Sequence, residues 1–277
     1  MTVRECVTTI ERAILCVYNE QREALAVARQ VVSYLLGYNF SQLVLNYDSE
    51  CNIPNLDEII TKLQASCPVQ YIVGQSEFCS LILHVQPGVL IPRPETEELV
   101  MQIINSSKTG ATVLDVGTGS GAIAIAIAKG VAQSRVTAID ISDTALEVAA
   151  KNAKQNGVDI TLLKRDALGD FSDIGKFDII VSNPPYIPES DYVSMRANVV
   201  DYEPHIALFV PNDDTLCFYR SIAQNALKML NSEGSLYFEI YEHFGEQIVS
   251  MLEQMGFRDV TLAKDIFGKS RMVWCKR

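Results

Sequence analysis

Apolar residues recur at the spacing of buried helix faces throughout the first quarter of the chain. The stretches with this spacing are "VTTIERAILCVY" (7–18), "EALAVARQVVSYLLG" (23–37), "FSQLVLNY" (40–47) and "NLDEIITKLQAS" (55–66). Each of them predicts a helix. Gly37 is placed to stop the second helix, and Asn55 with Glu58 three residues later is typical of a capping box. The sequence therefore predicts a small helical bundle over residues 1–68.

The pattern changes after this bundle. "EFCSLILHVQPGVLIP" (77–92) contains two strand-like segments and a Pro-Gly pair, which predicts a hairpin with its turn at Pro87 and Gly88. A helix is expected from Pro94 or just after it, because proline is favoured at the start of a helix. We therefore assign residues 69–93 to a hairpin linker.

Short apolar runs alternate with helical patterns from residue 111 onward. Strands are predicted at 112–116, 135–140, 160–166, 177–183, 234–240, 258–265 and 271–276. Helices are predicted at 121–130, 142–157, 214–231 and 244–256. This alternation predicts an α/β domain over residues 94–277, with a mostly parallel sheet covered by helices on both faces. The last two strands have only a short connection, so we expect them to form an antiparallel edge.

The composition is that of a globular protein that can bury a core, with 48% hydrophobic and 21% charged residues. The net charge is −11, from 23 Lys and Arg against 34 Asp and Glu. No run of Lys and Arg is present, so direct binding to duplex nucleic acid is not expected. The acidic balance instead favours a basic protein or a basic complex as partner.

The cysteines and histidines argue against a metal site. The 7 cysteines form no C-x-x-C pair, and the 3 histidines are scattered along the chain. An odd number of unpaired cysteines is typical of a reducing compartment. No apolar run approaches the roughly 20 residues of a membrane span, and the first residues lack the apolar core of a signal peptide. We therefore expect a cytoplasmic protein that does not bind membranes.

The stretch "VLDVGTGSG" (113–121) carries the first candidate chemistry. A strand runs into Gly117, Gly119 and Gly121 and a helix follows, so the backbone can turn sharply and offer free N–H groups to a ligand. Dinucleotide-binding enzymes use a similar loop. Here Asp115 precedes the glycines, and an acidic residue disfavours a pyrophosphate and suits a cationic ligand. A tight turn without a ligand is the alternative.

Acidic residues also end the next two predicted strands. Asp140 lies about 20 residues beyond the glycine loop, where a carboxylate can accept both hydroxyls of a ribose. Asp166 ends the third strand in the same row. Three acidic strand ends fit an adenosine that bears a positive group, which is the chemistry of S-adenosylmethionine. The alternative is that Asp140 and Asp166 are caps at the surface.

The stretch "SNPPY" (182–186) indicates what such a cofactor is used for. Pro184 and Pro185 cannot continue a strand, so the chain leaves the sheet at Asn183 and stays stiff. We expect the Asn183 side-chain oxygen and the Pro184 carbonyl to accept both N–H bonds of a planar NH₂ group, with Tyr186 lying over it. Two such acceptors aim a weakly nucleophilic nitrogen at a methyl carbon. A rigid turn is the alternative.

Several stretches together resemble a known family. They are "PVQYIVGQSEF", "VLIPRPETEELV", "VLDVGTGSGAIAIAIA", "FDIIVSNPPYIP", "YEPHIAL" and "FGKSRMV". Over nearly the whole chain the sequence is similar to the HemK/PrmC family, the peptide chain release factor glutamine methyltransferases. The resemblance implies a Rossmann-like class I S-adenosylmethionine-dependent methyltransferase fold. It also implies that the helical bundle and the hairpin help to recognise the substrate protein.

The same resemblance implies a reaction and a site. The reaction is methyl transfer from S-adenosylmethionine to the side-chain nitrogen (N5) of the glutamine in the Gly-Gly-Gln loop of release factors. The implied cofactor residues are Gly117, Thr118, Gly119, Ser120, Gly121, Asp140, Asp166, Ala167, Leu168 and Asn183. The implied substrate-binding residues are Asn183, Pro184, Pro185 and Tyr186, of which Asn183, Pro184 and Tyr186 are the candidate catalytic residues.

Other functions stay open from the sequence alone. One is methylation of a glutamine in a ribosomal protein; another is methylation of adenine N6 or guanine N2 in nucleic acid, which the acidic charge disfavours. A non-catalytic protein that binds the cofactor or a release factor is disfavoured by the intact "NPPY". Two positions depart from the family pattern, because Leu168 stands where relatives can carry an aromatic residue and Tyr241 where a glycine is expected. The roles left open are those of Arg93, Glu95, Thr96, Glu203 and Tyr241.

Overall fold

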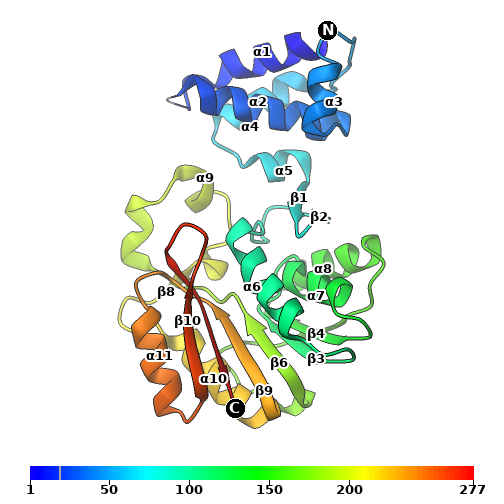
Figure 1. Cartoon of the computed structure of the whole chain (residues 1–277). Coiled ribbons are helices and arrows are strands. Elements are labelled where there is room, and N and C mark those ends of the chain that lie inside the picture. Colours follow the sequence, from blue (N-terminus) through cyan, green and yellow to red (C-terminus); the bar gives the residue numbers. More distant parts are fainter. Residues whose placement is uncertain (19) are drawn as a thin grey trace. The chain divides into compact units, whose positions relative to one another are not determined.

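The computed structural model describes residues 1–18 and 20–277, so the predicted bundle is described except at residue 19 (Figure 1). The chain divides into two compact units. The helical unit comprises Met1–Gln75 and Arg196–Tyr202, and the sheet unit comprises Ser76–Met195 and Glu203–Arg277. Within the described residues, no helix combines the length and the apolar character needed to cross a membrane.

The helical unit is built from short amphipathic helices. Its elements are α1 (Val3–Ile14), α2 (Gln21–Leu36), α3 (Phe40–Leu45), α4 (Leu56–Gln64), α5 (Val69–Val73) and α9 (Ala197–Val200). The apolar faces of α1 to α5 share one core, in which Ile10, Val31 and Leu63 are completely buried. Gly37 ends α2 in the left-handed conformation, as predicted.

The capping box predicted at Asn55 is not formed. Asn55 precedes α4 with φ 57°, and its side chain makes no hydrogen bond to the helix. An N-cap side chain reaches the first turn only from an extended backbone, and the left-handed conformation turns it away. Capping boxes form instead at Thr2, with Glu5, and at Asn39, with Gln42.

The hairpin turn also differs from the prediction. Strands β1 (Gln75–Phe78) and β2 (Leu81–His84) pair with each other, and the turn between them is Cys79 and Ser80. Both turn residues have positive φ, 48° and 60°, as a two-residue type I′ turn demands. The Pro-Gly pair at 87–88 follows the hairpin. The turn escaped prediction because neither of its residues is the glycine or asparagine that favours this conformation.

The sheet unit contains strands in the order β10-β11-β9-β6-β3-β4-β5. Their bounds are β3 (Thr112–Val116), β4 (Arg135–Asp140), β5 (Thr161–Lys164), β6 (Phe177–Ser182), β9 (Leu230–Glu239), β10 (Arg258–Lys264) and β11 (Ser270–Lys276). Strands β5, β4, β3, β6 and β9 pair in parallel, whereas β11 is antiparallel to both β9 and β10. The predicted mostly parallel sheet with an antiparallel edge is therefore confirmed.

Helices cover both faces of this sheet. On one face lie α6 (Pro94–Ser106), α7 (Ala122–Gly130) and α8 (Asp143–Gln155), and on the other α10 (Cys217–Met229) and α11 (Gly245–Gln254) (Figure 1). Successive side chains of a strand alternate between the faces, so Val113 joins the core under α6 and α7 and Leu114 the core under α10 and α11. The short elements are η1 (Ser172–Ile174), β7 (Ile187–Pro188), η2 (Glu189–Ser194), η3 (His205–Ala207) and β8 (Phe209–Val210).

A buried amide joins the hairpin to the glycine loop. Asn152 of α8 is completely buried, and its Oδ1 accepts from His84 N at 2.6 Å. Its Nδ2 donates to the carbonyls of His84 (2.9 Å) and Ser120 (2.8 Å). One side chain thus holds the end of β2 and the loop after β3 against the same helix.

We expect Asn152→Ala to lower the free energy of unfolding by about 1–3 kcal/mol, because buried backbone groups of His84 and Ser120 would lose their partner. Urea unfolding measures this change. Lys151→Ala, on the exposed side of the same helix, is the control and should stay within about 0.5 kcal/mol of the unsubstituted protein. An Asn152→Ala effect as small as the control's would contradict the role given to this amide.

Candidate functional site

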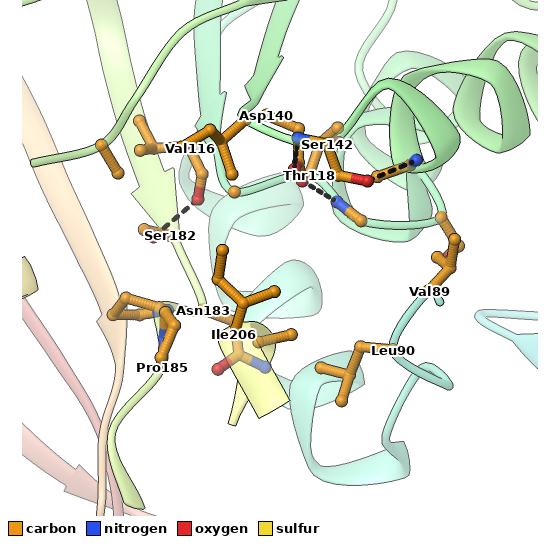
Figure 2. A pocket seen from close by; sticks show the side chains of 18 of the residues that line it. Val89, Leu90, Val116, Thr118, Asp140, Ser142, Ser182, Asn183, Pro185 and Ile206 are labelled. Atoms are coloured by element: carbon orange, nitrogen blue, oxygen red, sulfur yellow. Dashed lines mark hydrogen bonds between the residues drawn. The ribbon is translucent and has the colours of Figure 1, made fainter. Parts of the chain in front are cut away.

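A pocket of about 260 Å³ opens at the carboxyl ends of β3, β4 and β6. Figure 2 shows Thr118 and Asp140 on one side of this pocket and Asn183 and Ile206 on the other. The segment around Val89 closes a third side (Figure 2). In open α/β sheets, this edge is where ligands bind.

Gly117 and Gly119 bring the backbone directly to the pocket. Their φ angles are 76° and 55°, which glycine adopts without strain. A Cβ built on either residue would meet no atom within 4 Å, so open space lies beside both. Thr118 and Ser120 also line the pocket. The loop is tied to β4 because the Gly117 N–H donates to the Ile139 carbonyl at 2.9 Å.

Gly121 serves the packing of the helices. It precedes α7 and is not among the residues that line the pocket. A Cβ on Gly121 would lie 3.1 Å from the Ala149 Cβ, which is tighter than ordinary contact. The absence of a side chain therefore lets α7 pack closely on α8.

Asp115 does not face a ligand, contrary to the expectation drawn from its sequence position. Its carboxyl is completely buried and is not part of the pocket lining. One oxygen accepts from Thr118 Oγ1 (2.6 Å) and Ala124 N (3.2 Å); the other has no partner among the described residues. Burial raises the pKa of Asp115 to about 7, against the effect of these hydrogen bonds. Asp115 thus braces the glycine loop from behind.

Asp140 ends β4 at the wall of the pocket. Its two carboxylate oxygens accept from Gly119 N and from Ser142 N, both at 2.9 Å (Figure 2). A carboxylate oxygen has two lone pairs, so each can still accept one further hydrogen bond. Asp140 is therefore fixed by the backbone and can still bind two neighbouring hydroxyl groups.

An apolar wall lies next to Asp140. Asp166, Ala167 and Leu168 all line the pocket, and Asp166 accepts from Leu168 N at 2.8 Å. Leu168 and Ile141 are 49% and 44% exposed although they are aliphatic, and Ile206, on the side of Asn183, is 63% exposed. A flat apolar ring bound in the pocket would cover this surface.

Asn183, Pro184 and Pro185 line the pocket directly after β6. The Asn183 Nδ2 donates to Thr96 Oγ1 at 3.3 Å. No described residue donates a hydrogen bond to Asn183 Oδ1 or to the Pro184 carbonyl. Two acceptors are therefore available at the end of this strand.

Tyr186 lies outside this pocket and lines a second cavity of about 280 Å³, with Asp191, Arg271 and others. Its ring stacks on Tyr241, with centroids 6.0 Å apart, and its hydroxyl donates to Glu239 Oε1 at 3.2 Å. Tyr241 also donates to Asp191 at 2.9 Å. Tyr241, which stands where a glycine was expected, is therefore a neighbour of the "NPPY" segment and lines the second cavity, not the pocket beside the glycine loop.

An ion pair that no local pattern reveals joins two walls of the pocket. Glu203 is 4% exposed and accepts from Arg93 Nη2 (2.6 Å) and from Ile91 N (3.1 Å). Glu203 thereby ties the segment before α6, which contains Ile91 and Arg93, to the segment that begins at Glu203 itself. The sequence left the role of Glu203 open, and in the structure it braces these two segments. Val89 and Leu90, which also line the pocket, were missed because apolar loop residues carry no chemical signal.

These features fit S-adenosylmethionine. Asp140 would hold the ribose hydroxyls, Leu168 and Ile141 would contact the adenine, and the backbone at Gly117 and Gly119 would lie along the methionine part. The fit rests on free lone pairs, on open space beside glycine backbone and on exposed aliphatic surface.

The chain is similar to known methyltransferases. A family model described as the methyltransferase small domain matches residues 95–200. The release factor glutamine methyltransferase of Bacteroides thetaiotaomicron is 42% identical over 259 residues, covering 92% of this chain and 93% of that protein. That of Flavobacterium psychrophilum is 46% identical over 222 residues, 78% of each. A crystal structure of a methyltransferase from Pyrococcus furiosus shares the fold, with a TM-score of 0.53 and 20% identity over 71% of this chain and 88% of that chain.

The buried Asp115 should make stability fall as pH rises. Between its ordinary pKa near 4 and about 7, the folded state keeps a proton that the unfolded state has lost. The free energy of unfolding must then decrease with pH over this window. We expect the stability of the protein relative to its Asp115→Asn variant to decline between about pH 4 and 7, measured by urea unfolding. A constant difference would show that Asp115 is ionised in both states.

We expect Asp140→Asn to weaken the binding of S-adenosylmethionine about 10- to 100-fold, because a hydrogen bond to a charged group contributes about 1.5–3 kcal/mol. Isothermal titration calorimetry measures the affinity. Asp143→Asn is the matched control, since Asp143 is exposed, pairs with Lys164 and does not line the pocket. Equal affinities of the two variants would remove Asp140 from the site.

Proposed function

The chain belongs to the release factor glutamine methyltransferases, and we propose that it methylates the glutamine of the Gly-Gly-Gln loop in peptide chain release factors. The acceptor is the side-chain amide nitrogen (N5) and the cofactor is S-adenosylmethionine. The observation that carries this proposal is the pair of unoccupied acceptors, Asn183 Oδ1 and the Pro184 carbonyl, on the same pocket as Asp140.

The two acceptors match the shape of a primary amide. A glutamine side chain ends in an NH₂ group with two hydrogens in one plane. The Asn183 oxygen would take one hydrogen and the Pro184 carbonyl the other. Pro184 and Pro185 fix the backbone φ angles here, so the carbonyl is held in place before the substrate arrives. Because this carbonyl is already in position, little conformational entropy is lost when the substrate binds, and this favours the reaction.

An amide nitrogen is a weak nucleophile because its lone pair is delocalised into the carbonyl. Bound S-adenosylmethionine supplies a methyl group on a positively charged sulfur. Asn183 and Pro184 would orient the nitrogen and increase its electron density through both N–H bonds. Because neither residue is a strong base, we expect the proton to leave the nitrogen only after transfer.

The helical unit and the hairpin are proposed to recognise the release factor. The support comes from α3, which exposes Phe40 (63%), Val44 (46%) and Leu45 (84%). Large apolar residues that gather on one short helix are typical of protein contact surfaces. Tyr186 would complete the substrate site from the second cavity.

A transfer assay with labelled S-adenosylmethionine tests the substrate. We expect label on the Gly-Gly-Gln glutamine of a purified release factor, located by peptide mapping, and none on a release factor in which that glutamine is alanine. A ribosomal protein and DNA are offered in parallel. Label only on one of these would keep the chemistry of Asn183 but replace the substrate.

We expect Asn183→Ala to lower methyl transfer about 100-fold or more, as loss of one well-placed polar group in a reacting site does. The affinity for S-adenosylmethionine, measured by calorimetry, should fall much less. Asn231→Ala is the control, because Asn231 is exposed and does not line the pocket. Near-normal turnover of Asn183→Ala would exclude the two-acceptor mechanism.

A further inference from the structure

Two consecutive hydrogen bonds connect the Asn183 side chain to buried residues. Asn183 Nδ2 donates to Thr96 Oγ1 at 3.3 Å, and Thr96 Oγ1 donates to Glu239 Oε2 at 2.5 Å. Thr96 lies in the first turn of α6, and Glu239 is the last residue of β9. They are 4% and 1% exposed. Polar groups this deep persist only where hydrogen bonds satisfy them.

The direction of these bonds follows from the number of hydrogens. Thr96 has a single hydroxyl hydrogen, and it donates this hydrogen to the Glu239 carboxyl. That hydrogen is therefore committed to Glu239, and the lone pairs of Thr96 Oγ1 face Asn183. The Asn183 amide can satisfy them only with its NH₂ group.

The hydrogen bonds of Glu239 are those of an acceptor. Burial raises the pKa of this carboxyl and the Glu95 charge adds to the rise, whereas the Thr96 hydroxyl, the Arg271 charge and the Tyr186 hydroxyl oppose it. The Thr96 and Tyr186 hydroxyls donate to different oxygens of Glu239. Both oxygens thus act as acceptors, which is the pattern of a carboxylate. Arg271 is itself fixed by the buried Asp265 at 3.2 Å.

The orientation of the Asn183 amide decides whether the site works. The oxygen and nitrogen of an asparagine amide are almost identical in shape, so packing cannot distinguish them. With the amide reversed, NH₂ would face the NH₂ of the substrate and the acceptor would be lost. We propose that Thr96 and Glu239 are positioning residues that hold the Asn183 amide with its oxygen toward the substrate nitrogen.

Thr96→Val tests this inference, because it keeps the size of the side chain and removes the hydroxyl. We expect kcat for release factor methylation to fall about 10- to 100-fold, as misplacement of a reacting group does. The affinity for S-adenosylmethionine should change less than about 2-fold. Thr96→Ser restores the hydroxyl and should recover most of the lost turnover. Ser106→Ala removes a hydroxyl from the other end of α6 and should leave kcat unchanged.

A second measurement reports on the amide itself. The side-chain NH₂ of Asn183 is observed by ¹⁵N NMR without cofactor or substrate and is assigned from its absence in Asn183→Asp. We expect its hydrogens to exchange with water faster in Thr96→Val and at the original rate in Thr96→Ser. Unchanged exchange together with unchanged kcat in Thr96→Val would overturn the inference. If Thr96→Val does not fold, Thr96→Ala takes its place in both measurements.

The part of Glu239 is tested by combining substitutions. A glutamine at this position can point its own NH₂ at Thr96, which would reverse the bond. If Glu239 acts through Thr96, Glu239→Gln should reduce kcat less in the Thr96→Val background than in the unsubstituted protein. An equal reduction in both backgrounds would remove Glu239 from the proposal.

The inference rests on the proposed function for the identity of the substrate NH₂ group. The two can fail separately. If the unsubstituted protein transfers no label to a release factor, the proposed function fails, and the exchange of the Asn183 hydrogens still decides whether Thr96 orients the amide.

Discussion

The register of three parallel strands is the constraint on which the pocket depends. Val116 of β3 lies opposite both Ile139 of β4 and Ser182 of β6. The next residues of the three strands are a glycine, an aspartate and an asparagine, and they lie at one level at the edge of the sheet. The Ser182 hydroxyl donates to the Val116 carbonyl at 2.7 Å and helps to fix that level. A slip of one residue would send alternate side chains to the opposite face and disperse the three groups.

This constraint explains why so much could be predicted from the sequence. The alternation of strands and helices predicts which ends of the strands meet, so three short motifs are enough to place Gly117, Asp140 and Asn183 around one pocket. Each motif also carries its own chemistry: backbone freedom, a carboxylate, or an amide followed by rigid prolines. The pocket could therefore be inferred without knowledge of any side-chain contact.

The parts that escaped prediction depend on pairs distant in sequence or on backbone conformations with no residue signature. Thr96 and Glu239 are separated by 143 positions, and Arg93 and Glu203 by 110. Nothing local marks such partners, because a buried carboxylate is identified only by what surrounds it. The direction of Tyr186, which lines the second cavity and not the first, is likewise set by its tertiary contacts with Glu239 and Tyr241. Cys79 adopts the left-handed conformation although it is neither glycine nor asparagine. The local residue preferences therefore predicted the turn at Pro87 and Gly88 instead.

Pro184, which follows Asn183, also affects how long the protein keeps the asparagine side chain intact. Asparagine side chains deamidate slowly. In this reaction the backbone nitrogen of the next residue loses its hydrogen and attacks the carbonyl carbon of the side-chain amide, which closes a ring. Pro184 has no such hydrogen. The route is therefore blocked at Asn183, where an ionised aspartate would replace a neutral amide whose NH₂ group donates to Thr96. The proline that stiffens the segment also preserves its chemistry over time.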